Sequence, residues 1–228
     1  MIHIEIQKKL HGSQGDMLLD VKLEIQKSAF IVLMGESGSG KTTLLRVLAG
    51  LERAEGNISV DDVAWLQEHK MIPPQQREIG FVFQDYALFD NMSVEENLLF
   101  VNEDRVLAKK LLELTELTQL ASRNVKGLSG GQKQRVSLCR AMMKKPKLLL
   151  MDEPLSALDP AMRIKLKDEI LKLHRTFGTT TIMISHDMEV SYQLADRILV
   201  LDHGNVIADG KPDEIFTKAS TVKYTLNI

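Results

Sequence analysis

The sequence predicts an α/β fold in which a mixed sheet with an N-terminal antiparallel part is interrupted by a helical insertion. Residues 1–25 alternate between apolar and polar side chains, which is typical of strands with one buried face. Short apolar runs of the kind found in buried parallel strands occur at residues 30–34, 148–151, 180–184 and 198–201. Residues 93–145 have mostly helical spacing instead.

The N-terminal part begins with two antiparallel strands. Ile2, Ile4 and Ile6 lie on one face of the first strand, and residues 17–25 alternate in the same way in the second. The polar segment between them, Lys8 to Asp16, contains two glycines and predicts the turn.

A wholly apolar strand, Phe30–Met34, leads into a glycine-rich loop and a helix from Lys41 to about Ala49. Gly50 is suited to end that helix. The further segments expected along the chain are strands at Gly56–Val60 and Ile79–Phe83, a loop at Met71–Pro74 and a crossover helix at Pro160–Thr176.

The insertion is expected at residues 85–145, as a helical subdomain between the core segments 1–84 and 146–228 of one domain. Ser93 and Glu96 have the spacing of a capping box. The helical pattern is clearest between Glu103 and Leu120, where the apolar positions are Val106, Leu107, Leu111, Leu114 and Leu117.

Composition limits the possible classes of protein. The chain has 228 residues, enough for one large domain, and its net charge of −2 predicts no nucleic-acid partner. The one cysteine, Cys139, cannot form an internal disulfide and is expected to be a buried thiol in a reducing compartment. We expect no signal peptide and no transmembrane segment, because no apolar run approaches the roughly 20 residues that a bilayer requires.

Residues Gly35 to Thr43, GESGSGKTT, fit the pattern GxxxxGK[ST] between a buried strand and a helix. Gly38 and Gly40 allow the backbone N–H groups to approach phosphate oxygens. Lys41 can reach the β- and γ-phosphates, and the Thr42 hydroxyl can bind magnesium. The motif predicts a P-loop NTPase core that binds a nucleoside triphosphate, and it leaves a kinase, a GTPase and an ATPase all open.

An acidic pair, Asp152 and Glu153, follows the strand at Leu148–Met151. The carboxyl end of a parallel strand lies at the ligand edge of an α/β sheet. Asp152 is therefore placed to help hold magnesium, and Glu153 to activate a water molecule. The alternative is a polar strand end before a turn at Pro154.

The segment Leu128–Gln132, LSGGQ, precedes a helix that carries Arg135 and Arg140. Ser129, two glycines and a helix N-terminus form a second anion-binding device. Taken alone, the segment is also compatible with a simple helix cap.

With this segment, the chain resembles the nucleotide-binding subunit of an ATP-binding cassette (ABC) transporter over essentially its whole length. LSGGQ matches the family's signature sequence. Gln84 in FVFQD, the loop Ser156–Asp159 and His186 in MISHD match further family elements. Each has a simpler interpretation: Gln84 as a strand end, Asp159 as an N-cap before Pro160, and His186 as part of a helix start.

The resemblance implies a role for each residue. Glu153 is the catalytic base, His186 contacts the γ-phosphate, and Gln84 contacts magnesium and water. Thr42, Gln84 and Asp152 are implied as ligands of Mg²⁺. The residues implied to bind ATP are His11, Gly35, Ser37, Gly38, Ser39, Gly40, Lys41, Thr42, Thr43, Ser129, Gly130, Gly131, Gln132 and Asp159. His11 stands where the family usually stacks an aromatic ring on adenine, because residues 1–29 contain no Phe, Tyr or Trp.

The resemblance also implies partners. Two nucleotide-binding subunits, expected as a homodimer, pair head to tail, so that Ser129 and Gly131 serve the partner's ATP. Transmembrane permease subunits dock near Gln84, and an extracytoplasmic solute-binding protein acts indirectly. The chain is then a peripheral protein at the cytoplasmic face of the membrane.

The run from Ile72 to Phe100 resembles importers of inorganic oxyanions, ferric iron, polyamines and thiamine, and the compact N-terminus resembles molybdate-type subunits most. Asp90 stands where these importers often have proline. We expect no C-terminal regulatory domain. The alternatives are an ABC ATPase for another solute, one of the lipoprotein-release or cell-division type, a non-transport ABC ATPase of DNA repair, and a binding module without turnover.

Overall fold

A computed structural model describes residues 1–12, 15–68 and 70–219 of the chain. They form two compact units, the first made of residues 1–77 and 182 onward and the second of residues 78–181. The strand β9 begins in the second unit and ends in the first. No helix among these residues is long and apolar enough to cross a bilayer.

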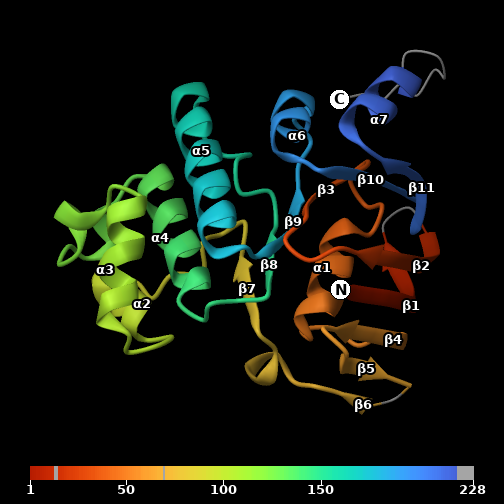
Figure 1. The fold of residues 1–228 in the computed structure, drawn as a ribbon, viewed down its shortest axis with the longest axis horizontal. Helices are drawn as coiled ribbons and strands as arrows, with labels where there is room; N and C mark the ends of the chain where they lie inside the picture. Colours follow the sequence, from red (N-terminus) through yellow and green to blue (C-terminus); the bar gives the residue numbers. More distant parts are fainter. Residues whose placement is uncertain (13–14, 69, 220–228) are drawn as a thin grey trace. The chain divides into compact units, whose positions relative to one another are not determined.

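The first unit is built on a mixed sheet with the strand order β6-β5-β4-β1-β2-β11-β10-β3, followed by the end of β9 (Figure 1). Its strands are β1 (Ile2–Gly12), β2 (Gly15–Ile25), β3 (Phe30–Met34), β4 (Glu55–Val60), β5 (Val63–Gln67), β6 (Lys70–Met71), β9 (Thr180–Ile184), β10 (Arg197–Asp202) and β11 (Asn205–Gly210). Its helices are α1 (Lys41–Ala49), a 3₁₀ turn at Pro74–Gln76, α6 (Met188–Leu194) and α7 (Pro212–Ala219).

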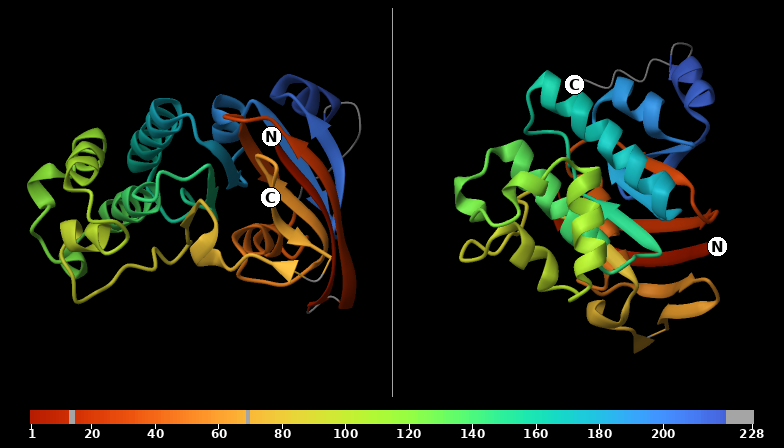
Figure 2. Two further views of the ribbon diagram at one scale, coloured as in Figure 1. Left: turned by 60° about the horizontal axis from the view of Figure 1, so that its bottom comes forward. Right: turned by 60° about the vertical axis from the view of Figure 1, so that its left-hand side comes forward.

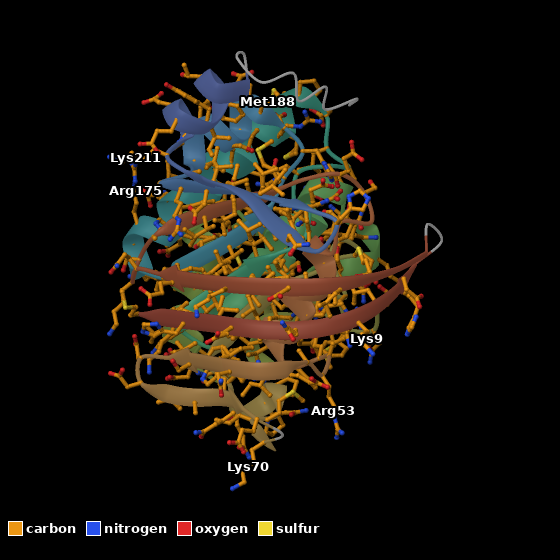
Figure 3. The ribbon with its side chains drawn as sticks, turned by 90° about the vertical axis from the view of Figure 1, so that its right-hand side faces the viewer. Lys9, Arg53, Lys70, Arg175, Met188 and Lys211 are labelled. Atoms are coloured by element: carbon orange, nitrogen blue, oxygen red, sulfur yellow. The ribbon has the colours of Figure 1, made fainter. Side chains whose placement is uncertain are left out.

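The two long strands β1 and β2 pair antiparallel along their whole described length and run side by side in Figure 2. Every second residue is buried from Ile2 to Ile6 and from Leu19 to Ile25, as the alternation predicts. The opposite face carries polar side chains paired across the strands, such as Lys22 with Glu5 at 3.1 Å. Figure 3 views the molecule from this side, with the long strands crossing it and Lys9 labelled. The predicted turn at Lys8–Asp16 is too long, since both strands extend into it, and residues 13 and 14 lie outside the described residues.

Helix α1 begins and ends where the sequence predicts. Gly50 ends it in a left-handed conformation with φ of 77°. Arg77, which is fully buried, donates hydrogen bonds to the carbonyls of Val47 (3.0 Å) and Leu48 (2.6 Å) in the last turn. Burial lowers the pKa of this guanidinium to about 10, so it stays charged at neutral pH. The arginine thus supplies a donor to the Leu48 carbonyl at the helix end and a second donor to the Val47 carbonyl, which also accepts from the Gly50 N–H.

The second unit combines two parallel strands with helices and short turns. Its elements are β7 (Ile79–Val82), α2 (Val94–Leu99), α3 (Arg105–Leu114), 3₁₀ turns at Thr118–Leu120 and Val125–Gly127, α4 (Gly130–Met142), β8 (Leu148–Met151) and α5 (Pro160–Phe177). Ser93 and Glu96 form the predicted capping box at the start of α2. Helix α4 packs on β7 so closely that a Cβ atom at Gly80 would lie 2.5 Å from the Ala141 carbonyl oxygen. The division at residues 85 and 145 stays a prediction.

Several predicted elements are wrong in detail. The helix expected from Glu103 to Leu120 ends at Leu114, and Val106, predicted on its buried face, is 81% exposed. Strands β5, β6 and β11 have no counterpart in the prediction, and Met71, predicted in a loop, ends β6. Cys139 is buried as expected, and burial raises the pKa of its thiol to about 12.

Candidate functional site

The loop between β3 and α1 carries three glycines with positive φ. Gly35, Gly38 and Gly40 have φ of 140°, 84° and 104°, and Gly40 is the N-cap residue of α1. Because a glycine N-cap has no side chain, no side-chain oxygen caps the first turn of this helix. The N-terminus of α1 is therefore suited to bind an anion.

Lys41 is buried at the start of α1. Its Nζ donates to the carbonyl oxygens of Gly35 (2.8 Å) and Glu36 (2.7 Å), so the lysine holds the loop to its own helix. Thr42, next to it, is exposed, and Thr43 is half-buried. Ser37 lies exposed on the loop.

The loop fits a triphosphate with its metal. The buried Ser39 hydroxyl has no hydrogen-bond partner among the described residues, although a buried hydroxyl usually has one. It lies within the same loop as a buried ammonium group and three glycines with positive φ, which is the donor set that phosphate oxygens require. Thr42 supplies an exposed hydroxyl of the kind that binds the accompanying Mg²⁺.

Gly35→Ala is expected to lower the free energy of unfolding by at least about 3 kcal/mol, because a Cβ there would lie 2.0 Å from the Leu201 carbonyl oxygen. Gly38→Ala is the matched control, since it also has a positive φ but nothing lies within 4 Å of its added Cβ. Its expected cost is about 1 kcal/mol. Urea denaturation measures both, and equal losses would contradict the close approach.

His186 follows β9 and belongs to the first unit. The backbone N–H of Ser185 donates to the Leu33 carbonyl (3.3 Å), which brings the end of β9 beside the end of β3. His186 and the phosphate loop therefore start from the same edge of the sheet. The N-cap of α6 is Asp187, whose carboxylate accepts from Val190 N–H at 3.0 Å, so the cap does not require the imidazole.

His11 lies on β1, well exposed to solvent. Its Nδ1 is 2.7 Å from a carboxylate oxygen of Asp16 on the neighbouring strand. Its stacking on adenine stays a prediction.

In the second unit, Gln84 and the acidic pair share one edge of the sheet. Strands β7 and β8 run parallel with Val82 opposite Met151, so both chains leave the sheet at the same end. The Asp152 N–H also donates to the Val82 carbonyl at 3.0 Å. Asp152 is buried, and Gln84 is exposed.

Glu153 has a φ of 47°, a left-handed conformation that is uncommon outside glycine. Its carbonyl accepts hydrogen bonds from the hydroxyl (3.0 Å) and the N–H (3.3 Å) of Ser156, which hold the turn in this shape. Strained backbone of this kind is concentrated at functional sites. The sequence alone could not indicate this conformation, which supports the functional role predicted for the carboxylate.

Ser129 caps α4 in a reciprocal capping box. Its hydroxyl accepts from Gln132 N–H (3.3 Å), and its own N–H donates to Gln132 Oε1 (2.9 Å). A Cβ on Gly130 would lie 3.1 Å from the Tyr86 hydroxyl, and one on Gly131 only 2.5 Å from Met162 Cγ. The cap interpretation is correct, and packing also explains both glycines.

Asp159 is the N-cap of α5, and its carboxylate accepts from Met162 N–H at 3.0 Å. The loop Ser156–Asp159 therefore ends at the start of a long helix. The capping alternative is confirmed, while a contact of this loop with a partner stays a prediction.

Sequence reasoning missed the part played by Arg140. Tyr86 and Ala87 both have positive φ, 63° and 47°, just after Gln84. Arg140 donates to their carbonyl oxygens, at 3.3 Å for Tyr86 and 2.6 Å for Ala87. A hollow of about 310 Å³ lies there, lined by Asp85, Tyr86, Ala87, Leu88, Asp90, Val125 and Lys133. Since the pairing joins residues far apart in sequence, no spacing pattern signals it.

Comparisons with known proteins identify the family of this chain. The family model described as ABC transporter matches residues 18–156. The chain is 45% identical over 212 residues to "Fe(3+) ions import ATP-binding protein FbpC 2" of Rhizobium meliloti, covering 89% of this chain and 53% of that protein. It is 38% identical over 231 residues to "Spermidine/putrescine import ATP-binding protein PotA" of Bacillus anthracis (97% and 69%). It is 41% identical over 210 residues to "Trehalose/maltose import ATP-binding protein MalK" of Thermococcus litoralis (87% and 56%).

Solved structures agree with the fold. The dimeric post-hydrolysis state of the ATP-binding cassette MJ0796, bound to ADP and Pi, superposes with a TM-score of 0.79 at 29% identity, covering 93% of this chain and 99% of that one. The cbiO1 subunit of Clostridium perfringens, part of an ABC transporter complex, gives 0.82 at 28% identity, covering 99% and 95%. The chain thus matches these cassettes over nearly their whole length, but only about half the length of two of the three named import proteins.

Proposed function

Because the chain belongs to the ABC transporter family, we propose that it binds and hydrolyses ATP to drive the import of a solute across a membrane. The observation that carries this proposal is the presence of two half-sites in one chain. One is the phosphate loop with the buried Lys41, and the other is the capped N-terminus of α4 at Ser129. Both are devices for binding phosphate oxygens.

In the first half-site, the loop N–H groups and Lys41 hold the β- and γ-phosphates, and Thr42 takes part in binding Mg²⁺. Asp152 and Gln84 would supply further ligands to the metal. A bound Mg²⁺ would neutralise charge that develops on the phosphate oxygens during transfer. The adenine lies toward His11, which is an exposed ring able to stack.

Glu153 acts as the general base that orients and deprotonates the attacking water. Its left-handed backbone, held by Ser156, fixes the direction in which the carboxylate leaves the strand end. His186 contacts the γ-phosphate from the end of β9. Such positioning matters because phosphoryl transfer needs in-line attack more than covalent help from the protein.

The second half-site serves another subunit. We propose a head-to-tail homodimer in which Ser129, Gly130, Gly131 and Gln132 bind the γ-phosphate of the partner's ATP, while the loop ending at Asp159 crosses the interface. The dimeric cassette superposed above supports this arrangement. ATP closes the pair and hydrolysis reopens it.

Permease subunits are proposed to dock on the second unit, beside Gln84. The hollow of about 310 Å³ beside that residue offers room for a docking segment. The exposed rings of Phe89 and Phe100, which lie tilted against each other with centroids 4.5 Å apart, support an apolar helix as the docking element. The protein then works as a peripheral subunit at the membrane, with an extracytoplasmic solute-binding protein acting through the permease.

The solute is a finer proposal. The resemblance favours an oxyanion such as molybdate, whereas the named relatives support ferric iron, a polyamine or a disaccharide. Uptake by vesicles that contain the chain and its permease, with molybdate, ferric iron, spermidine and maltose as separate arms, decides between them.

The proposed function is tested by Mg-ATP hydrolysis over a wide range of protein concentration. Because each ATP needs two subunits, the rate per chain is expected to rise with concentration and to level off as the dimer fills. Light scattering in the same samples reports the dimer. A constant rate per chain from a monomer would contradict the shared site. ATP binding without hydrolysis at any concentration would instead identify the chain as a nucleotide-binding module without turnover.

A further inference from the structure

The second unit contains a buried ion pair between helices α4 and α5. Arg135 Nη1 on α4 lies 3.6 Å from Glu169 Oε1 on α5, and the two side chains are 7% and 8% exposed. Neither carboxylate oxygen of Glu169 accepts a hydrogen bond from any described residue. A buried pair of this kind is a weak source of stability, because desolvation offsets much of the attraction. Its presence therefore suggests a purpose other than stability.

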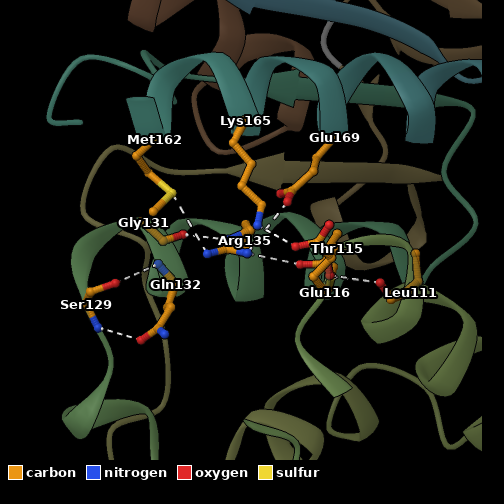
Figure 4. A network of polar contacts seen from close by, with 11 residues as sticks. Leu111, Thr115, Glu116, Ser129, Gly131, Gln132, Arg135, Met162, Lys165 and Glu169 are labelled. Atoms are coloured by element: carbon orange, nitrogen blue, oxygen red, sulfur yellow. Dashed lines mark hydrogen bonds and ion pairs between the residues drawn. The ribbon is translucent and has the colours of Figure 1, made fainter. Parts of the chain in front are cut away.

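Arg135 joins three helices through its other contacts, which Figure 4 shows together. Its Nε donates to the Gly131 carbonyl at 3.4 Å, in the first turn of α4. Its Nη1 donates to the Thr115 carbonyl at 3.2 Å, at the end of α3, and its Nη2 lies 3.8 Å from Met162 Sδ on α5. The guanidinium therefore fixes the first turn of α4 to both neighbouring helices.

The same region has close helix packing. Met162 lies against Gly131, where a Cβ atom would approach within 2.5 Å. Met162 is in the first turn of α5, directly after Asp159. Outside the core, Lys165 on α5 also pairs with Glu116, which follows α3. The two segments proposed to reach the partner subunit, Ser129–Gln132 and Ser156–Asp159, are thus joined through the starts of α4 and α5.

We propose that Glu169 is a positioning residue that acts through Arg135, holding Ser129–Gln132 and Ser156–Asp159 as one rigid surface for the partner subunit's ATP. The inference rests on the proposed function, because it concerns the half-site that serves the partner. Without the carboxylate, the remaining negative charge near the buried Arg135 is that of Glu116, which is exposed and already paired with Lys165. The guanidinium then gains free energy by moving toward water, and it releases the Gly131 carbonyl as it moves.

The charge of Glu169 depends on pH near neutrality. Burial raises the pKa of this carboxyl to about 7, with nearby Glu116 adding to the rise and Arg135, Lys165 and Lys172 opposing it. Above that pH the carboxylate attracts Arg135, and below it the neutral acid does not. ATP-driven dimerisation should therefore strengthen as pH rises through about 7. The free energy of unfolding should change in the opposite sense. The pKa of Glu169 is higher in the folded chain than in the unfolded one, so the protonated carboxyl favours the folded chain, and this stabilisation is complete below the unfolded pKa. It is lost as pH rises through about 7.

The test uses the full chain with Glu153→Gln as parent, so that ATP is retained. Glu169→Gln and Arg135→Lys are added to it singly, with Glu78→Gln as control, because Glu78 is an exposed carboxylate paired with Lys147 in the same unit. Two quantities are measured: dimerisation with ATP, by sedimentation, and the affinity of the monomer for a fluorescent ATP analogue. Both test variants are expected to dimerise about tenfold more weakly, with unchanged analogue affinity, and the control to match the parent. Glu169→Gln should also lose part of the pH dependence around 7.

The outcomes separate the two proposals. If the parent binds the analogue but never dimerises with ATP, the shared site is wrong and this inference falls with it. If the parent dimerises and a folded Glu169→Gln variant dimerises equally well at every pH, only the inference is overturned. Arg135→Lys keeps the positive charge and decides the question if Glu169→Gln fails to fold, since undiminished dimerisation of that variant overturns the inference too.

Discussion

Glu153→Gln is expected to bind ATP as tightly as the unmodified chain and to hydrolyse it at least about a hundredfold more slowly. The amide keeps the size of the side chain and its hydrogen-bonding reach, but it cannot accept a proton from the attacking water. Because ATP then persists, the variant should accumulate as an ATP-bound dimer. Phosphate release measures turnover, and sedimentation with Mg-ATP measures the dimer.

Glu78→Gln serves as the matched control for this variant too. It makes the same chemical change on an exposed carboxylate that follows the first unit and pairs with Lys147. Its turnover should equal that of the unmodified chain. Hydrolysis by Glu153→Gln at the unmodified rate would remove Glu153 from the mechanism, even if the dimer still formed.

Lys41→Met is expected to weaken ATP binding by at least about a hundredfold, and turnover with it. Methionine retains the apolar stem in the buried position but supplies no charge for the phosphates. It also removes the two hydrogen bonds to Gly35 and Glu36, at 2.8 and 2.7 Å, that hold the loop to α1. Titration with a fluorescent ATP analogue measures the affinity.

Lys9→Met is the control for that change, because Lys9 lies exposed on β1 and takes part in neither half-site. Thermal unfolding of both variants shows whether the loop variant is still folded. If a folded Lys41→Met variant bound ATP with undiminished affinity, the assignment of this loop as the phosphate-binding loop would be wrong.

Much of the fold could be predicted because short, local sequence patterns mark its core elements. Strand β3 and helix α1 have the predicted bounds, since a wholly apolar run and a glycine-rich loop mark them. Strand β5 was missed because its burial does not alternate: Val63 and Ala64 are exposed, and Trp65 and Leu66 are buried. Strand β11 was missed because its apolar residues, Val206 to Ala208, follow one another without alternating with polar residues, and the run is too short to indicate a buried strand.

The candidate site also contains some residues that local sequence predicts and some contacts that it does not. Lys41, Glu153 and Ser129 were predictable because each stands in a short contiguous motif at the end of an element. The supporting contacts were not predictable, because they join residues distant in sequence. Glu169 illustrates this, since a carboxylate in the middle of a charged helix gives no local sign that it is buried against Arg135. Val106 shows the reverse error, an apolar residue at helical spacing that faces solvent.

The backbone conformation and the proposed chemistry at position 153 favour different residues. Glycine or asparagine would adopt that conformation at a lower cost, whereas glutamate there costs about 1 kcal/mol or more of folding free energy. In the proposed mechanism, the carboxylate of Glu153 is the group that accepts the proton of the attacking water. For protein engineering, a substitution at position 153 is therefore expected to raise thermostability and lower turnover together.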